Sequence, residues 1–125
     1  MNNTYLLDTH ILLWWLANDK KLTKKISALI ENPDNYILVS AVSIWEIAIK
    51  KSLKKLKAPD NLKEALEVND FHLLSMTADH ALQIEHLPNH HNDPFDRLLI
   101  AQCQVEGLTF ITADKIIPKY KIKCF

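Results

Sequence analysis

Glycine is almost absent from this sequence, with one residue among 125. Charge of one sign is also missing, because lysine plus arginine and aspartate plus glutamate each total 15. Hydrophobic residues make up 48% of the chain and charged residues 24%, the balance of an ordinary globular protein. This composition excludes a collagen-like or disordered chain. The zero net charge excludes a global field that would draw the protein to nucleic acid or to an anionic membrane.

Cysteine and long apolar runs are scarce as well. Cys103 and Cys124 are too few and too far apart to predict a disulfide framework or a zinc knuckle, so we expect reduced thiols. The longest apolar stretch, residues 11–17, is too short to cross a bilayer. The first ten residues lack the basic and apolar regions of a signal peptide. We therefore expect a cytoplasmic protein.

No repeat, low-complexity tract or flexible linker divides the chain, which predicts a single domain spanning residues 1–125. Short apolar runs predict strands at residues 5–7, 36–39, 71–74 and 108–111, with a weaker candidate at 120–125. Amphipathic patterns predict helices at residues 22–30 and 44–56, and residues 98–105 predict a helix that is apolar on nearly every side. This alternation predicts an α/β fold with a mostly parallel central sheet, covered by helices on both faces.

Acidic residues follow two of the predicted strands, where parallel sheets gather their ligands. Asp8 comes directly after residues 5–7 and before an apolar helix, so it serves as a helix N-cap or as a functional carboxylate. Asp114 follows residues 108–111 in a Thr-Ala-Asp tripeptide. Because the same tripeptide at residues 77–79 starts a predicted helix, the tripeptide alone does not distinguish a site from a helix start.

Two further acidic residues lie within predicted helices. If Ser43 caps the helix in SAVSIWEIAIK (residues 40–50), Glu46 completes a capping box. If Ser40 is the cap, Glu46 becomes an acidic residue in an apolar stretch, which is costly unless it is paired. In HHNDPFDRLLIAQ (residues 90–102), Asp93 followed by proline predicts a helix start. Asp96 then complements the helix dipole or belongs to a site.

The convergence of these acidic residues favours a functional site. Asp8, Glu46, Asp96 and Asp114 are each predicted at the same end of the sheet, on different elements. Several carboxylates in one site raise one another's pKa unless a cation neutralises them, and oxygen ligands suit Mg²⁺ or Mn²⁺. The chemistry that this set implies is metal-assisted phosphoryl hydrolysis.

At these residues the chain resembles the PIN-domain ribonucleases, specifically the VapC-type toxins of bacterial type II toxin–antitoxin pairs. The resemblance covers almost the whole chain and rests on LLDTHILLWWL, SAVSIWEIAIK, HHNDPFDRLLIAQ and FITAD, of which the first and third are specific. It implies a three-layer α/β/α fold with four to five strands and a Mg²⁺- or Mn²⁺-dependent endoribonuclease. It further implies a homodimer and a cognate antitoxin that blocks the acidic site.

The resemblance also assigns roles to single residues. The acidic residues of the family fall, in order, on Asp8, Glu46, Asp96 and Asp114. Asp8 and Asp96 would ligate the metal, helped directly or through water by Asp114 and Glu46. Asp93 also belongs to the motif of this subgroup. Because it is predicted to cap the helix, we expect it to support the metal ligands and not to bind the metal itself.

The remaining candidates are less specific. Thr112 and Ser40 would hold metal-bound water or cap local backbone. Arg97, the only arginine, would bind RNA phosphate or pair with a nearby acid, and His10 would contact RNA or face water. The adjacent histidines His90 and His91 come without a cysteine and do not have the spacing of zinc ligands.

Two other functions fit a small parallel domain with acidic strand ends. A receiver-like phosphoacceptor domain would need paired acids after the first strand and an acceptor aspartate after the middle strand, but Asp8 stands alone and Ser75 follows residues 71–74. A non-catalytic RNA-binding or partner-binding module on the same fold stays open, because fold does not determine function.

Overall fold

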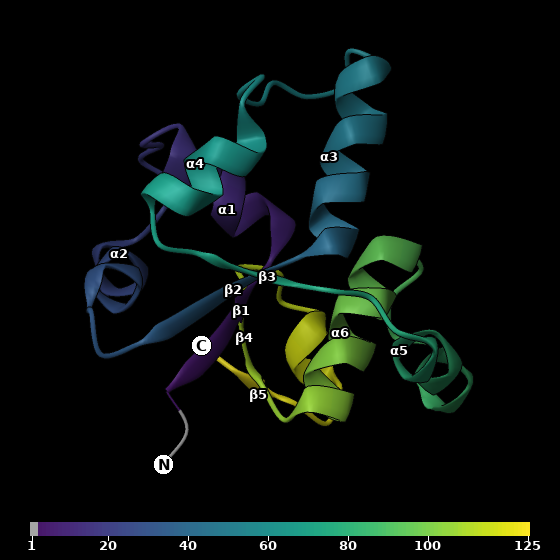
Figure 1. The fold of residues 1–125 in the computed structure, drawn as a ribbon. Helices are drawn as coiled ribbons and strands as arrows, with labels where there is room; N and C mark the ends of the chain where they lie inside the picture. The colour runs from purple at the N-terminus through teal and green to yellow at the C-terminus, as the bar shows by residue number, and fades with distance from the viewer. Residues whose placement is uncertain (1–2) are drawn as a thin grey trace.

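The short apolar runs form one sheet. The computed structural model, which describes residues 3–125, contains a fully parallel sheet of five strands in the order β3-β2-β1-β4-β5 (Figure 1). The strands are β1 (Thr4–Leu7), β2 (Tyr36–Ser40), β3 (His72–Leu74), β4 (Thr109–Ile111) and β5 (Lys123–Cys124). All four predicted strands are confirmed. The weaker candidate at residues 120–125 is also a strand, although only its Lys123–Cys124 part joins the sheet.

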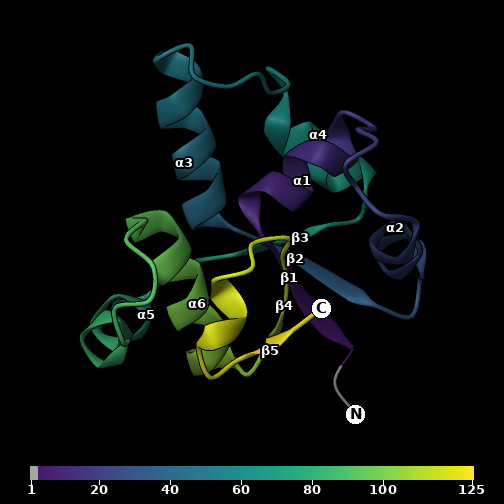
Figure 2. The ribbon, with the colours of Figure 1, turned by 180° about the vertical axis from the view of Figure 1, so that it is seen from behind.

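Alternating residues of the strands bury opposite faces of the sheet, as the pleat requires. Leu6 packs into one core together with residues of α6 (Pro94–Glu106), and Leu7 packs into a second core with residues of α1 (Thr9–Leu16), α2 (Lys24–Glu31) and α4 (Leu62–Val68). The ribbon shows α5 (Ala78–Gln83) and α6 on one side of the sheet, and α1, α2 and α4 on the other (Figures 1 and 2). The predicted three-layer α/β/α fold is therefore confirmed.

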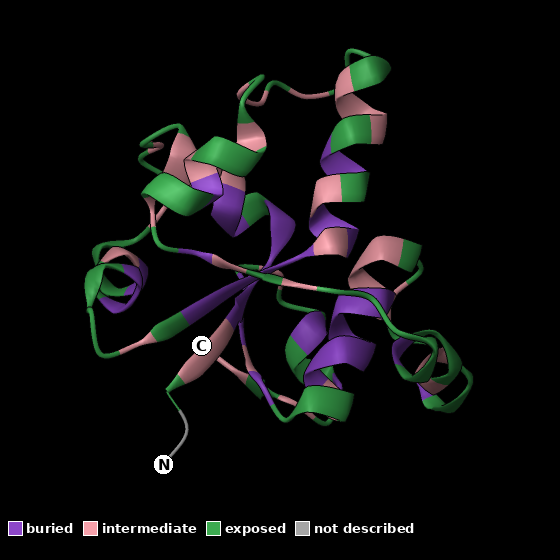
Figure 3. Ribbon diagram, in the orientation of Figure 1, coloured by how far each residue is buried: buried purple, intermediate pink, exposed green. Residues whose placement is uncertain are grey.

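One helix joins the two layers. In α3 (Ala41–Ser52), Val42 packs in the same core as α6, whereas Ile47 packs in the same core as α1. The buried residues of α3 lie in its first half, next to the sheet, whereas its residues from Ala48 onward are intermediate or exposed (Figure 3). This helix therefore stands beside the carboxyl ends of the strands and holds part of the site there.

The ends of the helices differ from the predictions where capping decides them. Ser40, not Ser43, caps α3, so this helix begins three residues earlier than expected; it ends at Ser52 because Lys54 adopts a left-handed conformation (φ 58°). Thr23 caps α2, which leaves Leu22 outside the helix. The single glycine of the chain, Gly107, ends α6 at φ 68°. The short α4 had no counterpart among the predicted helices.

The order of the strands places the site. β1 lies between β2 and β4, so the chain winds outward from β1 in opposite directions. Such a reversal leaves a crevice at the carboxyl ends of the two central strands, here β1 and β4. In receiver-type domains the first and third strands are neighbours, which is not the case here, so the receiver-like alternative is excluded. None of the helices in residues 3–125 is long and apolar enough to span a membrane.

Candidate active site

Four carboxylates come from four different elements at the carboxyl edge of the sheet. Asp8 follows β1 directly, Asp114 comes three residues after β4, Asp96 lies in the first turn of α6, and Glu46 lies in the middle of α3. A hollow of about 290 Å³ opens between three of these elements. It is lined by Asp8, His10, Trp14, Asp96, Ala113 and Asp114. Glu46 is not among the lining residues, but its charge acts on Asp8 and Asp96.

Asp8 occupies the N-cap position of α1, but its side chain caps nothing. One oxygen, Oδ2, accepts a hydrogen bond of 2.7 Å from the Thr112 hydroxyl, while Oδ1 is buried with no partner among residues 3–125. Burial raises the pKa of Asp8 above its ordinary value, although the hydrogen bond from Thr112 lowers it. The capping interpretation is therefore wrong, and Asp8, which lines the hollow, keeps one buried carboxylate oxygen without a partner in residues 3–125.

Glu46 is 2% exposed, which decides whether it belongs to a capping box or is a buried acidic residue of α3. Because Ser40 caps the helix, Glu46 is the buried acidic residue of the second interpretation, and no capping box forms. Its Oε2 pairs with the ammonium of Lys50 one turn later, and this hydrogen bond raises the pKa of Lys50. Its Oε1 is buried and unpartnered within the described chain, as is Oδ1 of Asp8.

Asp96 has a strongly perturbed carboxyl group. Burial, followed by the negative charges of Asp8 and Asp93, raises the pKa of Asp96 to about 7; nearby His91 opposes this shift. Its position in the first turn of α6 follows from the cap at Asp93, whose carboxylate accepts hydrogen bonds from the backbone N–H groups of Phe95 and Asp96. Acidic residues that are gathered without a cation are expected to raise one another's pKa in this way.

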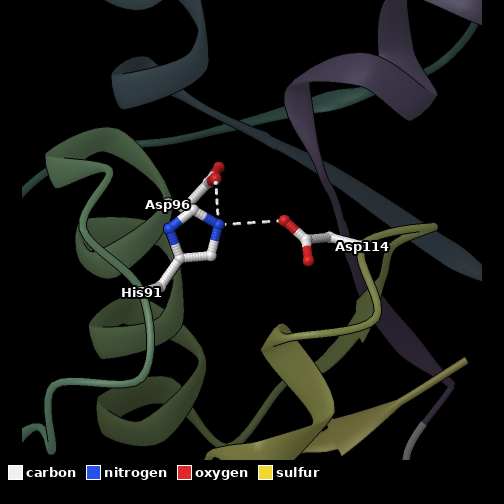
Figure 4. A group of neighbouring side chains, drawn as sticks. All are labelled: His91, Asp96 and Asp114. Carbon is white, nitrogen blue, oxygen red and sulfur yellow. Dashed lines mark hydrogen bonds and ion pairs between the residues drawn. The ribbon is translucent and has the colours of Figure 1, made fainter.

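His91 completes the group and was not among the predicted site residues. Its Nε2 lies 2.9 Å from Oδ2 of Asp114 and 3.1 Å from Oδ2 of Asp96 (Figure 4). Burial raises the pKa of Asp114, but hydrogen bonds from the Ile116 N–H and from His91 outweigh it, so that this pKa lies below its usual range. In the sequence, His91 stands in the motif of residues 90–102. From the sequence it is considered only as a zinc ligand, and not as a hydrogen-bond partner of the carboxylates.

The other predicted residues lie around this core in different ways. Thr112 joins two of the carboxylates, because its hydroxyl donates to Asp8 and accepts from the Asp114 N–H. Asp93 is a cap. The Ser40 hydroxyl accepts from the Val42 N–H and donates to Gln102, so its contacts are those of a cap. The exposed His10 borders the hollow.

Arg97 points away from the carboxylates. Its guanidinium donates to backbone carbonyls of the segment that precedes α6, including Pro88 at 2.9 Å, and to the Tyr120 hydroxyl at 3.3 Å. Contact of Arg97 or His10 with RNA stays a prediction.

The donor set fits a divalent cation. Two carboxylates, Asp8 and Glu46, each have one oxygen held by a protein donor and one buried oxygen with no partner in residues 3–125. Such orphaned oxygens are costly unless a ligand satisfies them. Hard oxygen donors of this kind suit Mg²⁺ or Mn²⁺.

Comparison with known proteins identifies the family of the chain. The sequence model of the PIN domain matches residues 5–123. The chain belongs to the PIN-domain family. A relative from Mycobacterium tuberculosis, Ribonuclease VapC22, is 27% identical over 121 residues, which cover 94% of this chain and 92% of the relative.

Solved structures share the fold of this PIN domain. The VapBC2 complex from Rickettsia felis, bound to a DNA fragment from its promoter, aligns with a TM-score of 0.72 and 14% identity over 98% of this chain and 97% of the matched chain. FitAcB from Neisseria gonorrhoeae aligns with a TM-score of 0.66 and 17% identity over 97% and 96%. At these identities the comparison establishes the fold alone.

Proposed function

We propose that this PIN domain, spanning residues 1–125, is a Mg²⁺- or Mn²⁺-dependent endoribonuclease that hydrolyses RNA phosphodiester bonds. The observation that carries the proposal is the pair of unpartnered, buried carboxylate oxygens on Asp8 and Glu46, beside the strained carboxyl group of Asp96. The relative from M. tuberculosis is named a ribonuclease, which supports RNA as the substrate.

Asp8 and Asp96 would hold the cation, helped directly or through water by Glu46 and Asp114. When bound, the cation lowers the pKa of water and stabilises negative charge on the phosphate. The chain's own residues orient these ligands: Thr112 fixes Asp8, and Lys50 fixes Glu46. None of the residues that line the hollow has a hydroxyl or thiol group, so no serine, threonine, tyrosine or cysteine is placed for attack on phosphorus.

The proposed biological role is that of the toxin in a type II toxin–antitoxin pair, acting as a homodimer in the cytoplasm. The matched structures support this role, because one is a VapBC2 complex and another, from Klebsiella pneumoniae, is described as a toxin–antitoxin complex (TM-score 0.59, 20% identity over 88% of this chain and 86% of the matched chain). A cognate antitoxin protein would then suppress cleavage by covering the acidic hollow.

The decisive experiment is cleavage of a defined mixed RNA pool, followed by sequencing of the new ends. The wild type should cut with Mg²⁺ or Mn²⁺ and not with EDTA, and Asp96→Asn and Asp114→Asn should lose cleavage. Asp79→Asn is the matched control, because Asp79 ends the second Thr-Ala-Asp tripeptide, on α5 rather than in the site. If the folded wild-type protein cuts no RNA under any condition, the chain is a non-catalytic binding module instead.

A further inference from the structure

Hydrogen bonds hold the backbone of His91 and of the segment that precedes it. Its backbone N–H donates to the Tyr120 hydroxyl at 2.8 Å, and Tyr120 is 3% exposed. The guanidinium of Arg97 bonds the carbonyl of Pro88 and the Tyr120 hydroxyl, so the segment that leads to His91 is anchored to α6 and to the end of η2 (Ile117–Lys119). The position of the imidazole is therefore set by the fold.

A hydrogen bond from the backbone shows which imidazole nitrogen of His91 carries the hydrogen. The N–H of Asp93 donates to Nδ1 of His91 at 3.1 Å. A backbone N–H can only donate, so Nδ1 of the neutral ring carries no hydrogen and Nε2 carries it. If the ring is protonated, Nε2 carries a hydrogen as well. In both states His91 therefore presents an N–H donor to Asp114 and Asp96.

The hydrogen-bond pattern of His91 is the reverse of the pattern of a metal-ligating histidine. One ligand atom from each of His91, Asp96 and Asp114 lies within 4.8 Å of the others, a cluster that resembles a metal site. A histidine that ligates a metal donates its other ring N–H to an acceptor, whereas here that other nitrogen is itself an acceptor. His91 instead matches Thr112, which donates to one oxygen of Asp8 and leaves the second open.

We propose that His91 is a positioning residue: its Nε2–H orients Asp96 and Asp114 for the divalent cation, and the imidazole does not bind the cation itself. The inference rests on the cation site of the proposed function, but not on RNA cleavage. Removing a hydrogen-bond partner of a ligand typically weakens metal binding by about 10–100-fold. Glutamine is the conservative replacement, because its side-chain amide nitrogen can take the place of Nε2 and donate.

The test measures Mn²⁺ binding by isothermal titration calorimetry and by pulsed electron paramagnetic resonance, without RNA. His91→Ala should bind Mn²⁺ about tenfold more weakly than the wild type, and His91→Gln should recover most of this loss. His86→Ala is the matched control, since His86 is exposed, lies in η1 (Ile84–His86) and does not line the hollow. Wild-type protein with ¹⁵N-labelled histidine should show no nitrogen coupling to the bound Mn²⁺. Circular dichroism checks that each variant is folded.

Four results would overturn the inference. A histidine nitrogen coupling that disappears in His91→Ala would make the imidazole a ligand. Tighter Mn²⁺ binding by His91→Ala would make His91 a competitor of the cation. An equal loss in His91→Ala and His91→Gln would show that the N–H donor is not what matters. If the folded wild type binds no divalent cation, the proposed cation site fails together with this inference, whereas normal binding without RNA cleavage would reject only the nuclease.

Discussion

At the scale of single residues, the site gathers negative charge that the fold does not neutralise. Asp8 and Glu46 are 4% and 2% exposed, and each keeps a buried oxygen without a partner in residues 3–125. Asp96 responds to the charges of both and to its own burial. Burying carboxylates in this way opposes folding, so the arrangement is favourable only when a cation binds the folded state.

This conflict predicts how stability depends on pH in the absence of a cation. The pKa of Asp96 is raised from 3.8 to about 7, so the folded state holds this proton more tightly than the unfolded state does. The contribution of Asp96 to stability is therefore complete below pH 4 and is lost as the pH rises through 7. We expect Asp96→Asn to increase the free energy of unfolding at pH 8 by on the order of a few kcal/mol, measured by urea denaturation with EDTA present.

Two controls separate this effect from a general change in packing. The stability difference between Asp96→Asn and the wild type should shrink as the pH falls from 8 to 4, because the wild-type carboxyl group then becomes neutral. Saturating Mn²⁺ should stabilise the wild type more than the variant. If the stability difference between Asp96→Asn and the wild type does not depend on pH, ionisation of Asp96 does not destabilise the folded state.

At the scale of elements, the start of α6 combines two tasks within a few residues. Asp93 caps the helix through two backbone N–H groups, Pro94 occupies the first turn, and Asp96 then faces the site. The segment before the cap delivers His91 to the same hollow. A change at Asp93 can therefore act through helix stability or through the site, and the two must be measured separately.

We predict that Asp93 acts on the site through the helix cap. Asp93→Ala should lower the free energy of unfolding by about 1 kcal/mol, whereas Asp93→Ser, which preserves a capping oxygen, should lower it by only a few tenths. RNA cleavage by Asp93→Ser should stay within about threefold of the wild type, since the serine still holds the backbone of Asp96. Urea denaturation and cleavage rates at saturating Mn²⁺ check both parts. A stable but inactive Asp93→Ser would show that the site depends on the negative charge of Asp93, acting on the cation or on Asp96, and not on the cap alone.

At the scale of the whole molecule, the sequence was sufficient for the layers and for the convergence of the carboxylates. Apolar runs of strand length marked every strand, and parallel strands end at one edge, so Asp8 and Asp114 could be placed together without coordinates. The ends of α3 could not be predicted, because two serines offered equal caps and only packing chooses Ser40. His91 was missed because its partner Asp114 is 23 residues away, beyond α6 and β4, and because the segment that carries His91 is held by Arg97 and Tyr120.

The charge distribution of the whole molecule leads to the last prediction. Net charge is zero, so attraction for RNA must be local. Lysines gather in residues 50–57, at the last turn of α3 and in the segment that follows it. Lys50 and Lys51 are paired with Glu46 and Asp60, whereas the side chains of Lys54, Lys55 and Lys57 are exposed. The rise of a helix puts Ser52, the last residue of α3, about 9 Å from Glu46 along the axis, and Lys54 follows two residues later.

Replacing these three exposed lysines by glutamine should weaken RNA binding and flatten its dependence on salt, by about 0.7 in the log–log slope for each phosphate that the protein no longer neutralises. Fluorescence anisotropy between about 50 and 200 mM salt measures the slope, with Asp96→Asn present in every protein so that the RNA stays intact. The matched control changes Lys20, Lys21 and Lys24, which form a second exposed cluster before and at the start of α2. An unchanged slope would reject a role for residues 54–57. An equal change in both variants would mean that lysines anywhere on the surface attract RNA, which a neutral protein with one directed binding path should not show.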